Sequence, residues 1–201
     1  YIMAGGGLMQ LVAYGAQDVY LSGNPQITFF KAVYKRHTNF SCEAIAQTFS
    51  GSPDFGRRVT CPITRNGDLI TKMYLVCKVS GTGASNWSWS SKLGHAMIDN
   101  VELEIGGSRI DKQYGDWMNI WESLTKSGSH DGAYNAMIGN TSAMTSLAAT
   151  HADQTLYVPL QFFCCRNNGL ALPLISLQYH DVRVNFEFAA GNTLVNYVGA
   201  T

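Results

Sequence analysis

Charge is scarce in this chain of 201 residues: only 14% of its side chains are charged, against roughly a quarter in an ordinary soluble domain. Basic residues number 14 and acidic residues also number 14, so the formal net charge is zero. A neutral chain has no large electrostatic field with which to attract a polyanion, which argues against direct binding of nucleic acid. A surface this poor in charge is expected where other protein covers it.

Long apolar runs are missing as well. The sequence contains no stretch of the length that crosses a bilayer as a helix. Its beginning also lacks a basic segment followed by an apolar core and a cleavage site. We therefore expect neither membrane insertion nor secretion.

Cysteines and histidines do not form a recognisable metal or disulfide pattern. The five cysteines are odd in number and none belongs to a C-x-x-C pair, which favours reduced thiols buried in strands. The five histidines are scattered along the chain, without metal-binding spacing to one another or to a nearby cysteine. The sequence thus predicts no metal site.

Catalytic motifs are absent too. There is no G-x-S-x-G elbow, and the glycine clusters lack both a phosphate-binding lysine and a strand-to-helix context. His180 and Asp181 are adjacent, but such a pair at the start of a strand is more often a local hydrogen bond than an acid–base pair. We predict no catalytic residue and no cofactor.

What the chain has in quantity is turns and alternating strands. It contains 20 glycines and only 5 prolines, and between its turn residues apolar and polar side chains alternate with period two. A hairpin is expected between the second and third strands, across Asn66-Gly67. The expected strands are residues 40–49 (with a bulge near Glu43), 57–63, 69–79, 101–105, 108–113, 155–165, 170–177 and 179–188. This pattern predicts an all-β fold.

Two stretches have helical spacing instead. After the turn at Asn24-Pro25, Ile27, Phe30, Val33 and Tyr34 share one helix face, and Lys31, Lys35 and Arg36 lie on the other. Residues 1–26 are expected to form an N-terminal arm before it.

The second helical stretch is Asp116–Leu124, with an apolar stripe of Trp117, Ile120, Trp121 and Leu124 that we expect to pack on the domain. It is followed by a long insertion, residues 126–154, with helical turns expected near 135–138 or 142–149. Loops of this length inside compact domains are commonly functional or contact a partner.

The segment 80–92 reads as a polar loop that carries Trp87 and Trp89. Aromatic side chains among serine and glycine suit a contact loop, and packing back on the domain is an equal alternative. Three N-x-S/T sequons occur, at Asn39, Asn86 and Asn140. Because Asn86 and Asn140 are expected in loops, they are the better candidates for glycosylation.

Two sequence motifs resemble those of a known family. The run Gly15-Ala-Gln-Asp-Val-Tyr-Leu-Ser-Gly-Asn-Pro-Gln-Ile-Thr-Phe-Phe-Lys-Ala-Val-Tyr-Lys-Arg-His-Thr-Asn-Phe40 and the shorter Arg65-Asn-Gly-Asp-Leu-Ile70 resemble signatures of the major capsid proteins of large icosahedral double-stranded DNA viruses, the phycodnavirus, iridovirus and mimivirus group. The resemblance implies an eight-stranded antiparallel jelly-roll sandwich with short helices in the N-terminal segment and in loops. Family subunits carry two consecutive rolls. Residues 27–201 would be a single jelly-roll domain, the first of the two.

The resemblance also implies partners and a location. The chain would assemble as homotrimers that contact neighbouring capsomers and minor capsid proteins in the virion, after assembly in the host cytoplasm. An internal viral membrane would lie beneath the shell without being penetrated. The assembly contacts expected in the opening helix are Phe29, Phe30, Lys31, Tyr34, Lys35 and Arg36.

Two other classes share this architecture. A lectin-like jelly roll would use Trp87 and Trp89 as platforms for sugars. A cupin-like metalloenzyme would need a cluster of histidine and glutamate, which the sequence does not show.

Overall fold

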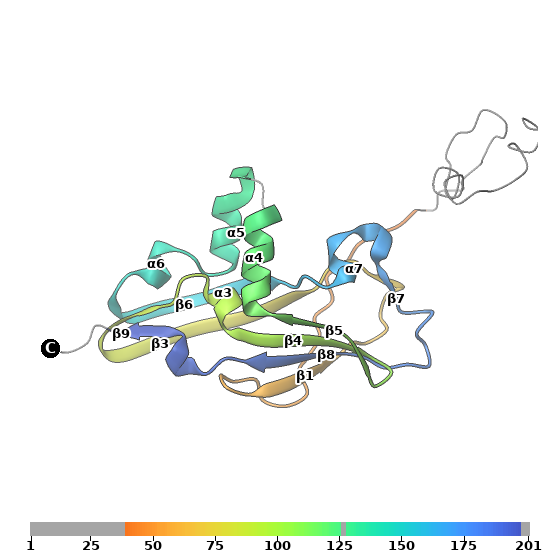
Figure 1. Cartoon of the computed structure of the whole chain (residues 1–201), viewed down its shortest axis with the longest axis horizontal. Helices are drawn as coiled ribbons and strands as arrows, with labels where there is room; N and C mark the ends of the chain where they lie inside the picture. The colour runs from red at the N-terminus through yellow and green to blue at the C-terminus, as the bar shows by residue number, and fades with distance from the viewer. Residues whose placement is uncertain (1–38, 126–127, 198–201) are drawn as a thin grey trace, which may run out of the picture. The chain divides into compact units, whose positions relative to one another are not determined.

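The computed structural model describes residues 39–125 and 128–197 (Figure 1). The chain divides into two compact units, Tyr1–Ala44 and Ile45–Thr201. The elements below belong to the second unit. The predicted arm, residues 1–26, and the predicted assembly contacts between Phe29 and Arg36 lie outside the described residues, so these predictions stay open.

Three antiparallel sheets make up the second unit. One has the strand order β1-β8-β4-β5, the next β6-β3-β9, and the third is the short pair β2-β7. The strands are β1 (Arg58–Pro62), β2 (Leu69–Ile70), β3 (Tyr74–Trp89), β4 (Ile98–Ile105), β5 (Ser108–Tyr114), β6 (Ala148–Pro159), β7 (Leu172–Pro173), β8 (Val182–Phe188) and β9 (Val195–Tyr197).

Short helices connect the strands, and most of them lie between β5 and β6 (Figure 1). The α-helices are α3 (Leu93–Ala96), α4 (Gly115–Thr125), α5 (Asp131–Met137), α6 (Ser142–Thr145) and α7 (Phe163–Arg166). The 3-10 turns are η1 (Gly128–His130), η2 (Asn168–Leu170) and η3 (Gly191–Thr193). The insertion predicted at 126–154 therefore contains α5 and α6, as expected, but its last part is the start of β6.

The two larger sheets share one hydrophobic core. Alternate residues of β8 point into it, and Val184 aligns with Cys61 on β1 and with Leu103 on β4. From the other sheet, Leu75 and Leu156 enter the same core. Facing apolar sides of two antiparallel sheets are the definition of a β-sandwich, so the predicted all-β class is confirmed.

Several local predictions are confirmed along with it. The alternation of apolar and polar residues predicted that Val182, Val184 and Phe186 point into the core, and all three are buried in β8. The predicted hairpin 101–113 is β4-β5, and its turn uses Gly106 and Gly107 with φ of 59° and 83°, values that glycine adopts at no steric cost.

The prediction of a polar loop over residues 80–92 is wrong. Strand β3 continues to Trp89, with register shifts against β6 after Val79 and after Thr82. The ring of Trp87 explains the glycines there: a Cβ on Gly81 or Gly83 would come within 2.7 or 2.6 Å of that ring. Glycine inside a strand here marks a close approach of a large side chain rather than a turn.

The predicted hairpin of residues 57–63 with 69–79 is also wrong. Strand β1 pairs with β8, and the second segment divides into β2, which pairs with β7, and β3, which pairs with β6 and β9. The two parts of 69–79 pair with strands of different sheets, so they cannot form one continuous strand.

Residues 40–49 form no strand in the described part of the chain; only Ser50 bridges to Thr60. Phe40 and Ile45 are exposed, so the alternation there has no sheet face to bury. The strand predicted at 155–165 is displaced, because β6 already begins at Ala148, and the strand predicted at 170–177 is shorter than expected. The first ends at Pro159, where proline has no N–H to continue the ladder, and the second is only β7.

Candidate assembly surface

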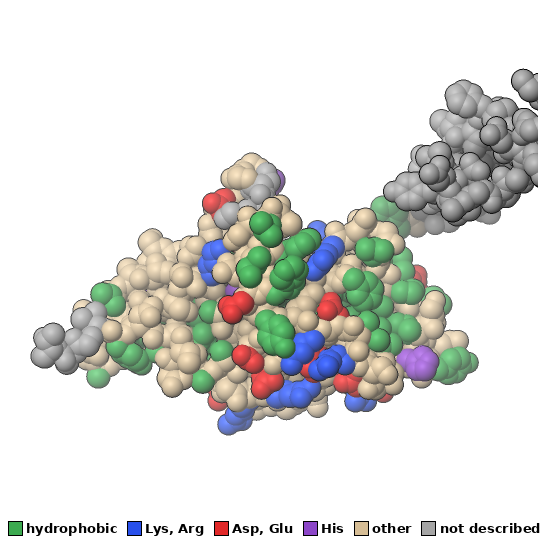
Figure 2. All heavy atoms as spheres, in the orientation of Figure 1, with side chains coloured by type: hydrophobic (Ala, Val, Ile, Leu, Met, Phe, Trp, Pro, Cys, Tyr) green, Lys and Arg blue, Asp and Glu red, His purple; other side chains and the backbone are tan. Residues whose placement is uncertain are grey.

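The apolar stripe of α4 lies on the outside of the protein. Trp117, Ile120 and Leu124 are 38%, 51% and 76% exposed, and Figure 2 shows hydrophobic side chains gathered over this helix. The residues that α4 buries are Gly115, Met118 and Glu122. Trp121 is half-buried and packs against Arg166, so the prediction that the stripe packs on the domain is wrong mainly for Ile120 and Leu124. We call Trp117, Ile120, Trp121 and Leu124 the α4 apolar face.

A buried ion pair holds the inner side of α4. The Lys92 Nζ donates to Asn119 Oδ1 at 2.7 Å and to Glu122 Oε2 at 3.1 Å. The Glu122 side chain is almost fully buried and that of Lys92 is about three-quarters buried. A carboxylate is tolerated at such a place when a cation and hydrogen bonds compensate it. The side of α4 that faces the domain is thus partly polar, and Ile120 and Leu124 lie on the side that faces solvent.

A neutral pair beside it connects α3 to α5. The His95 Nε2 lies 3.1 Å from the Tyr134 hydroxyl. Burial lowers the pKa of His95 to about 4, and the opposing effects of Glu122, which raises it, and Lys92, which lowers it, are smaller. Burial, with a smaller effect of Glu122, also raises the pKa of Tyr134 to about 12. Both groups are therefore uncharged near neutral pH.

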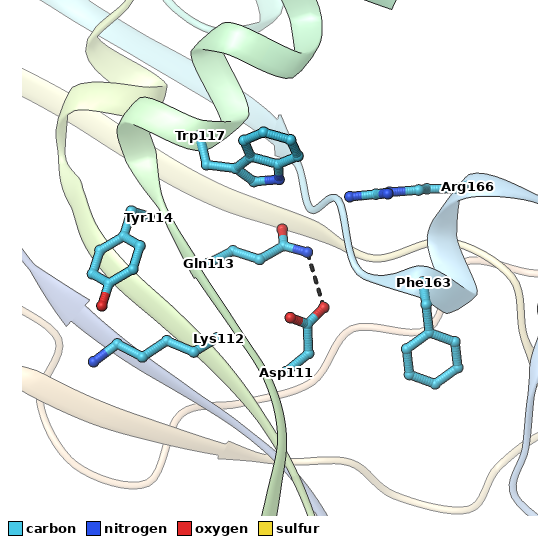
Figure 3. Close-up of a pocket in the computed structure, with 7 residues that line it drawn as sticks. All are labelled: Asp111, Lys112, Gln113, Tyr114, Trp117, Phe163 and Arg166. Carbon is cyan, nitrogen blue, oxygen red and sulfur yellow. Dashed lines mark hydrogen bonds between the residues drawn. The ribbon is translucent and has the colours of Figure 1, made fainter.

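A surface pocket of about 390 Å³ adjoins the α4 apolar face (Figure 3). Its walls come from β5, α4 and α7, and it is lined by Asp111, Lys112, Gln113, Tyr114, Trp117, Phe163 and Arg166. The Gln113 side chain is held in place there, because Nε2 donates to Asp111 Oδ2 at 3.0 Å and to the Gln161 carbonyl at 2.8 Å.

Arg166 connects this pocket to the helix. Its guanidinium carbon lies 4.2 Å from the ring centroid of Trp121, and its Nε donates to the Gln161 carbonyl at 3.1 Å. A guanidinium stacked on indole fixes both side chains. The pocket is thus walled by aromatic rings and rigid polar groups, as expected of a place that receives a side chain of another molecule.

The outer face of the β1-β8-β4-β5 sheet is polar by contrast. Glu102 lies there, as its alternation predicts, but its carboxylate is covered by cations. Arg58, Arg109 and Lys112 approach it at 2.8, 3.2 and 3.4 Å. This network stabilises the polar face of the sheet.

The two tryptophans proposed as sugar platforms are buried. Trp87 and Trp89 are 5% and 6% exposed and pack edge to face with centroids 4.8 Å apart. The Nε1 of Trp87 donates to the Ala149 carbonyl at 3.3 Å. A ring that is already covered cannot stack on a sugar, so the lectin prediction for these residues is wrong.

The sequon asparagines differ in their surroundings. Asn86 is exposed, whereas Asn140 is half-buried and its Nδ2 donates to Asn135 Oδ1 at 3.0 Å. A glycan would have to displace that hydrogen bond at Asn140. Glycosylation at either residue stays a prediction, and Asn86 is the more accessible.

Other chemistry finds no support in the described residues. Within residues 39–125 and 128–197, no three His, Cys, Asp or Glu side chains are grouped so as to hold a metal ion. No helix in the same part of the chain has the length and apolar character needed to span a membrane. Cys42 is exposed and Cys164 lies in α7, so neither is the buried strand residue that we predicted.

Residues 28–200 match the family model described as "Major capsid protein N-terminus". The chain belongs to this capsid protein family. The predicted resemblance is therefore confirmed, over most of the chain.

Relatives in this family are similar along nearly all of the sequence. The chain is 55% identical to the major capsid protein of Pyramimonas orientalis virus over 98% of its own length and 50% of the relative's. It is 48% identical to the major capsid protein of Paramecium bursaria Chlorella virus 1, over 98% of this chain and 44% of the relative. It thus spans about half the length of these curated relatives.

Solved structures of capsid proteins share the fold. The match to the VP54 crystal structure of PBCV-1, fitted into a reconstruction of the virophage Sputnik, has a TM-score of 0.68 at 40% identity and covers 87% of this chain and 41% of that one. The Faustovirus major capsid protein matches with a TM-score of 0.60 at 10% identity, over 94% of this chain and 49% of that one, which shows the fold alone. The predicted jelly-roll class is confirmed.

The residues that sequence reasoning missed are those that make α4 an outward-facing helix. Lys92 and Glu122 are far apart in sequence, and nothing in their local pattern predicts that they meet. The one available signal is the spacing of Gly115, Met118 and Glu122, which places a small, an apolar and an acidic residue on a single helix face.

Proposed function

We propose that this chain is a structural subunit of an icosahedral viral shell and acts by self-association rather than by catalysis. The observation that carries the proposal is family membership: relatives about half identical to this chain are named major capsid proteins. A second match, with a TM-score of 0.68, is to a chain in a quasi-atomic model of the PBCV-1 capsid. A shell subunit needs a rigid domain with contact surfaces, and a two-sheet sandwich with an exposed apolar helix face provides both.

The finer form of the proposal follows the family resemblance. Residues 1–26 are the arm and 27–201 the first jelly roll of a protein that forms homotrimeric capsomers. These capsomers contact their neighbours and minor capsid proteins in the virion, over an internal membrane that the protein does not enter, after assembly in the host cytoplasm. Neutral net charge supports packing against protein rather than against nucleic acid.

The direct experiment is to measure the mass of the purified protein by size-exclusion chromatography with light scattering, and to image it by negative-stain electron microscopy. We expect concentration-dependent multimers, with trimers as the main species. A protein that is monomeric at every soluble concentration would contradict self-association.

A basic cluster in the opening helix gives a separate prediction. Replacing Lys31, Lys35 and Arg36 with alanine is expected to reduce the yield of shells by roughly tenfold, because these cations are proposed to contact partners beneath the shell; that factor corresponds to about 1.4 kcal/mol of lost association energy. Particle yield is counted by electron microscopy in cells that produce the complete shell. The melting temperature should not change.

The matched control is the pair Arg57→Ala and Lys72→Ala, which removes exposed cations of the sandwich and should leave the yield unchanged. Normal particles from the triple variant would refute the role of the basic cluster. That result would not contradict the proposed function of the protein as a shell subunit.

A further inference from the structure

Two adjacent cysteines of α7 turn their thiols toward each other. The Sγ atoms of Cys164 and Cys165 are 3.8 Å apart, a hydrogen-bonding distance for sulfur. Consecutive side chains on a helix do not ordinarily face each other, so this contact requires both side chains to lean together. Cys164 is fully buried in the core, whereas Cys165 is only half-buried. One thiol is therefore held inside the domain and the other can be reached from solvent.

The contact makes the two thiols chemically unequal. A negative charge is costlier on the fully buried sulfur, so the Cys164 thiol donates the hydrogen bond and Cys165 accepts it. This hydrogen bond has the largest effect on the pKa of Cys165 and lowers it; backbone hydrogen bonds from Met73 and Phe162 add to the effect, and burial opposes it. The same contact, together with burial, raises the pKa of Cys164. Cys165 is thus the sulfur that more readily becomes a thiolate, the nucleophilic form of cysteine.

A covalent bond between these two sulfurs would be a reversible one. Consecutive Cα atoms lie about 3.8 Å apart, whereas the Cα atoms of a disulfide are usually about 4.4 to 6.8 Å apart. A bridge that departs from the preferred geometry is strained, and strained disulfides are more readily reduced than structural ones. The helix can deform to admit it, because α7 has only four residues. The pair is therefore expected to stay reduced until an oxidised thiol is in excess.

We propose that Cys164 and Cys165 form a site of reversible oxidation whose substrates are low-molecular-weight disulfides such as oxidised glutathione. The Cys165 thiolate attacks one sulfur of the external disulfide, and the other sulfur leaves as a thiolate that takes the proton of Cys164. The Cys164 sulfur then attacks Cys165 Sγ in the mixed disulfide. The second external thiolate leaves and takes up a proton from solvent, which replaces the one that Cys165 had released. One external disulfide thus becomes two thiols while the two cysteines become one disulfide.

Cys77 provides a matched control within the same molecule. Like Cys165 it is half-buried, and its Sγ also lies 3.8 Å from another sulfur. That sulfur is the Sδ of Met97, which has no proton to donate. Burial raises the pKa of Cys77 to about 11, against a smaller opposing effect of a backbone hydrogen bond with Leu156. If partial exposure alone determined reactivity, Cys77 and Cys165 would react alike.

The test measures which cysteines react with oxidised glutathione and what product each forms. The exposed Cys42 is replaced by serine in every protein, so that an ordinary surface thiol does not obscure the result. Samples are quenched with acid over time, free thiols are alkylated, and the peptides are identified by tandem mass spectrometry. Two further variants carry Cys164→Ser, which keeps a hydrogen-bond donor but cannot form a disulfide, or Cys165→Ser. Thermal melting verifies that each variant is folded.

We expect Cys165 to react at least about tenfold faster than Cys77 and to end in a disulfide with Cys164 that excess reduced glutathione reopens. Glutathione should remain attached to Cys165 in the Cys164→Ser variant, and Cys164 should stay unmodified in the Cys165→Ser variant. Equal rates at Cys77 and Cys165 would overturn the assignment of Cys165 as the attacking thiol, and this comparison needs neither variant. Glutathione retained on Cys165 while Cys164 is present would overturn the bridge, and a bridge that resists reduced glutathione would overturn its reversibility.

Discussion

Replacing Gly115 with alanine is expected to lower the free energy of unfolding by about 3 kcal/mol or more. A Cβ at this position would lie 2.2 Å from the carbonyl oxygen of His95 and 2.4 Å from that of Ile98. Both are backbone atoms, one in α3 and the other at the start of β4, so no side chain can rotate away to make room. The first turn of α4 would have to move off the sandwich.

Helix propensity acts in the opposite direction and is too small to compensate. Alanine is favoured over glycine in a helix by about 1 kcal/mol. Gly132→Ala in α5 isolates that effect, because Gly132 is exposed and a Cβ there meets nothing within 4 Å. We expect this control to be as stable as the wild type or slightly more stable.

Urea denaturation followed by circular dichroism measures both variants against the wild type. The decisive comparison is the sign of the change in the free energy of unfolding. We expect this free energy to fall for Gly115→Ala and to stay equal or rise slightly for Gly132→Ala. Equal stability of the two variants would show that α4 does not begin in such close contact with the backbone of α3 and β4.

The sequence correctly predicted those strands of the sandwich in which one face is buried in the core. In β8, Val184 and Phe186 sit between two partner strands and face the core, so the alternation of apolar and polar residues is complete and readable. The β4-β5 hairpin was equally readable because Gly106 and Gly107 mark its turn. Period-two patterns succeed when one sheet face is fully buried.

The sequence led to a wrong prediction where glycines that are typical of turns are instead required by a close tertiary contact. Gly81 and Gly83 are turn-forming residues by composition, yet they lie in a strand because the Trp87 ring covers them. The composition of a segment does not tell which side chain will approach it, and the pairing of β3 with β6 across more than sixty residues decides the outcome.

The candidate site was the least predictable feature. The stripe on α4 was found from its spacing, but its direction was assigned to the core, because a domain considered alone buries its apolar stripe. The actual direction depends on Lys92 reaching Glu122 and on the absence of a Cβ at Gly115, both tertiary effects.

Acid is expected to destabilise the protein through His95. The pKa of this side chain is about 4 in the folded protein because burial disfavours the imidazolium, and about 6.5 in the unfolded chain. As the pH falls below 6.5, the unfolded chain binds a proton that the folded protein does not, so stability is full above that pH and is lost progressively down to pH 4. From pH 7 to pH 5 the loss attributable to His95 is about 2 kcal/mol.

The measurement compares the wild type with His95→Gln by urea denaturation at a series of pH values between 7 and 5. Glutamine retains a polar group near the Tyr134 hydroxyl but does not titrate, so the variant loses the contribution of His95 while every other histidine and carboxylate titrates as before. The free-energy difference between the two proteins should therefore narrow by about 2 kcal/mol as the pH is lowered. A difference that stays constant across this range would mean that His95 is hydrated or charged in the folded protein, and that α3 and α5 are not joined by a neutral pair.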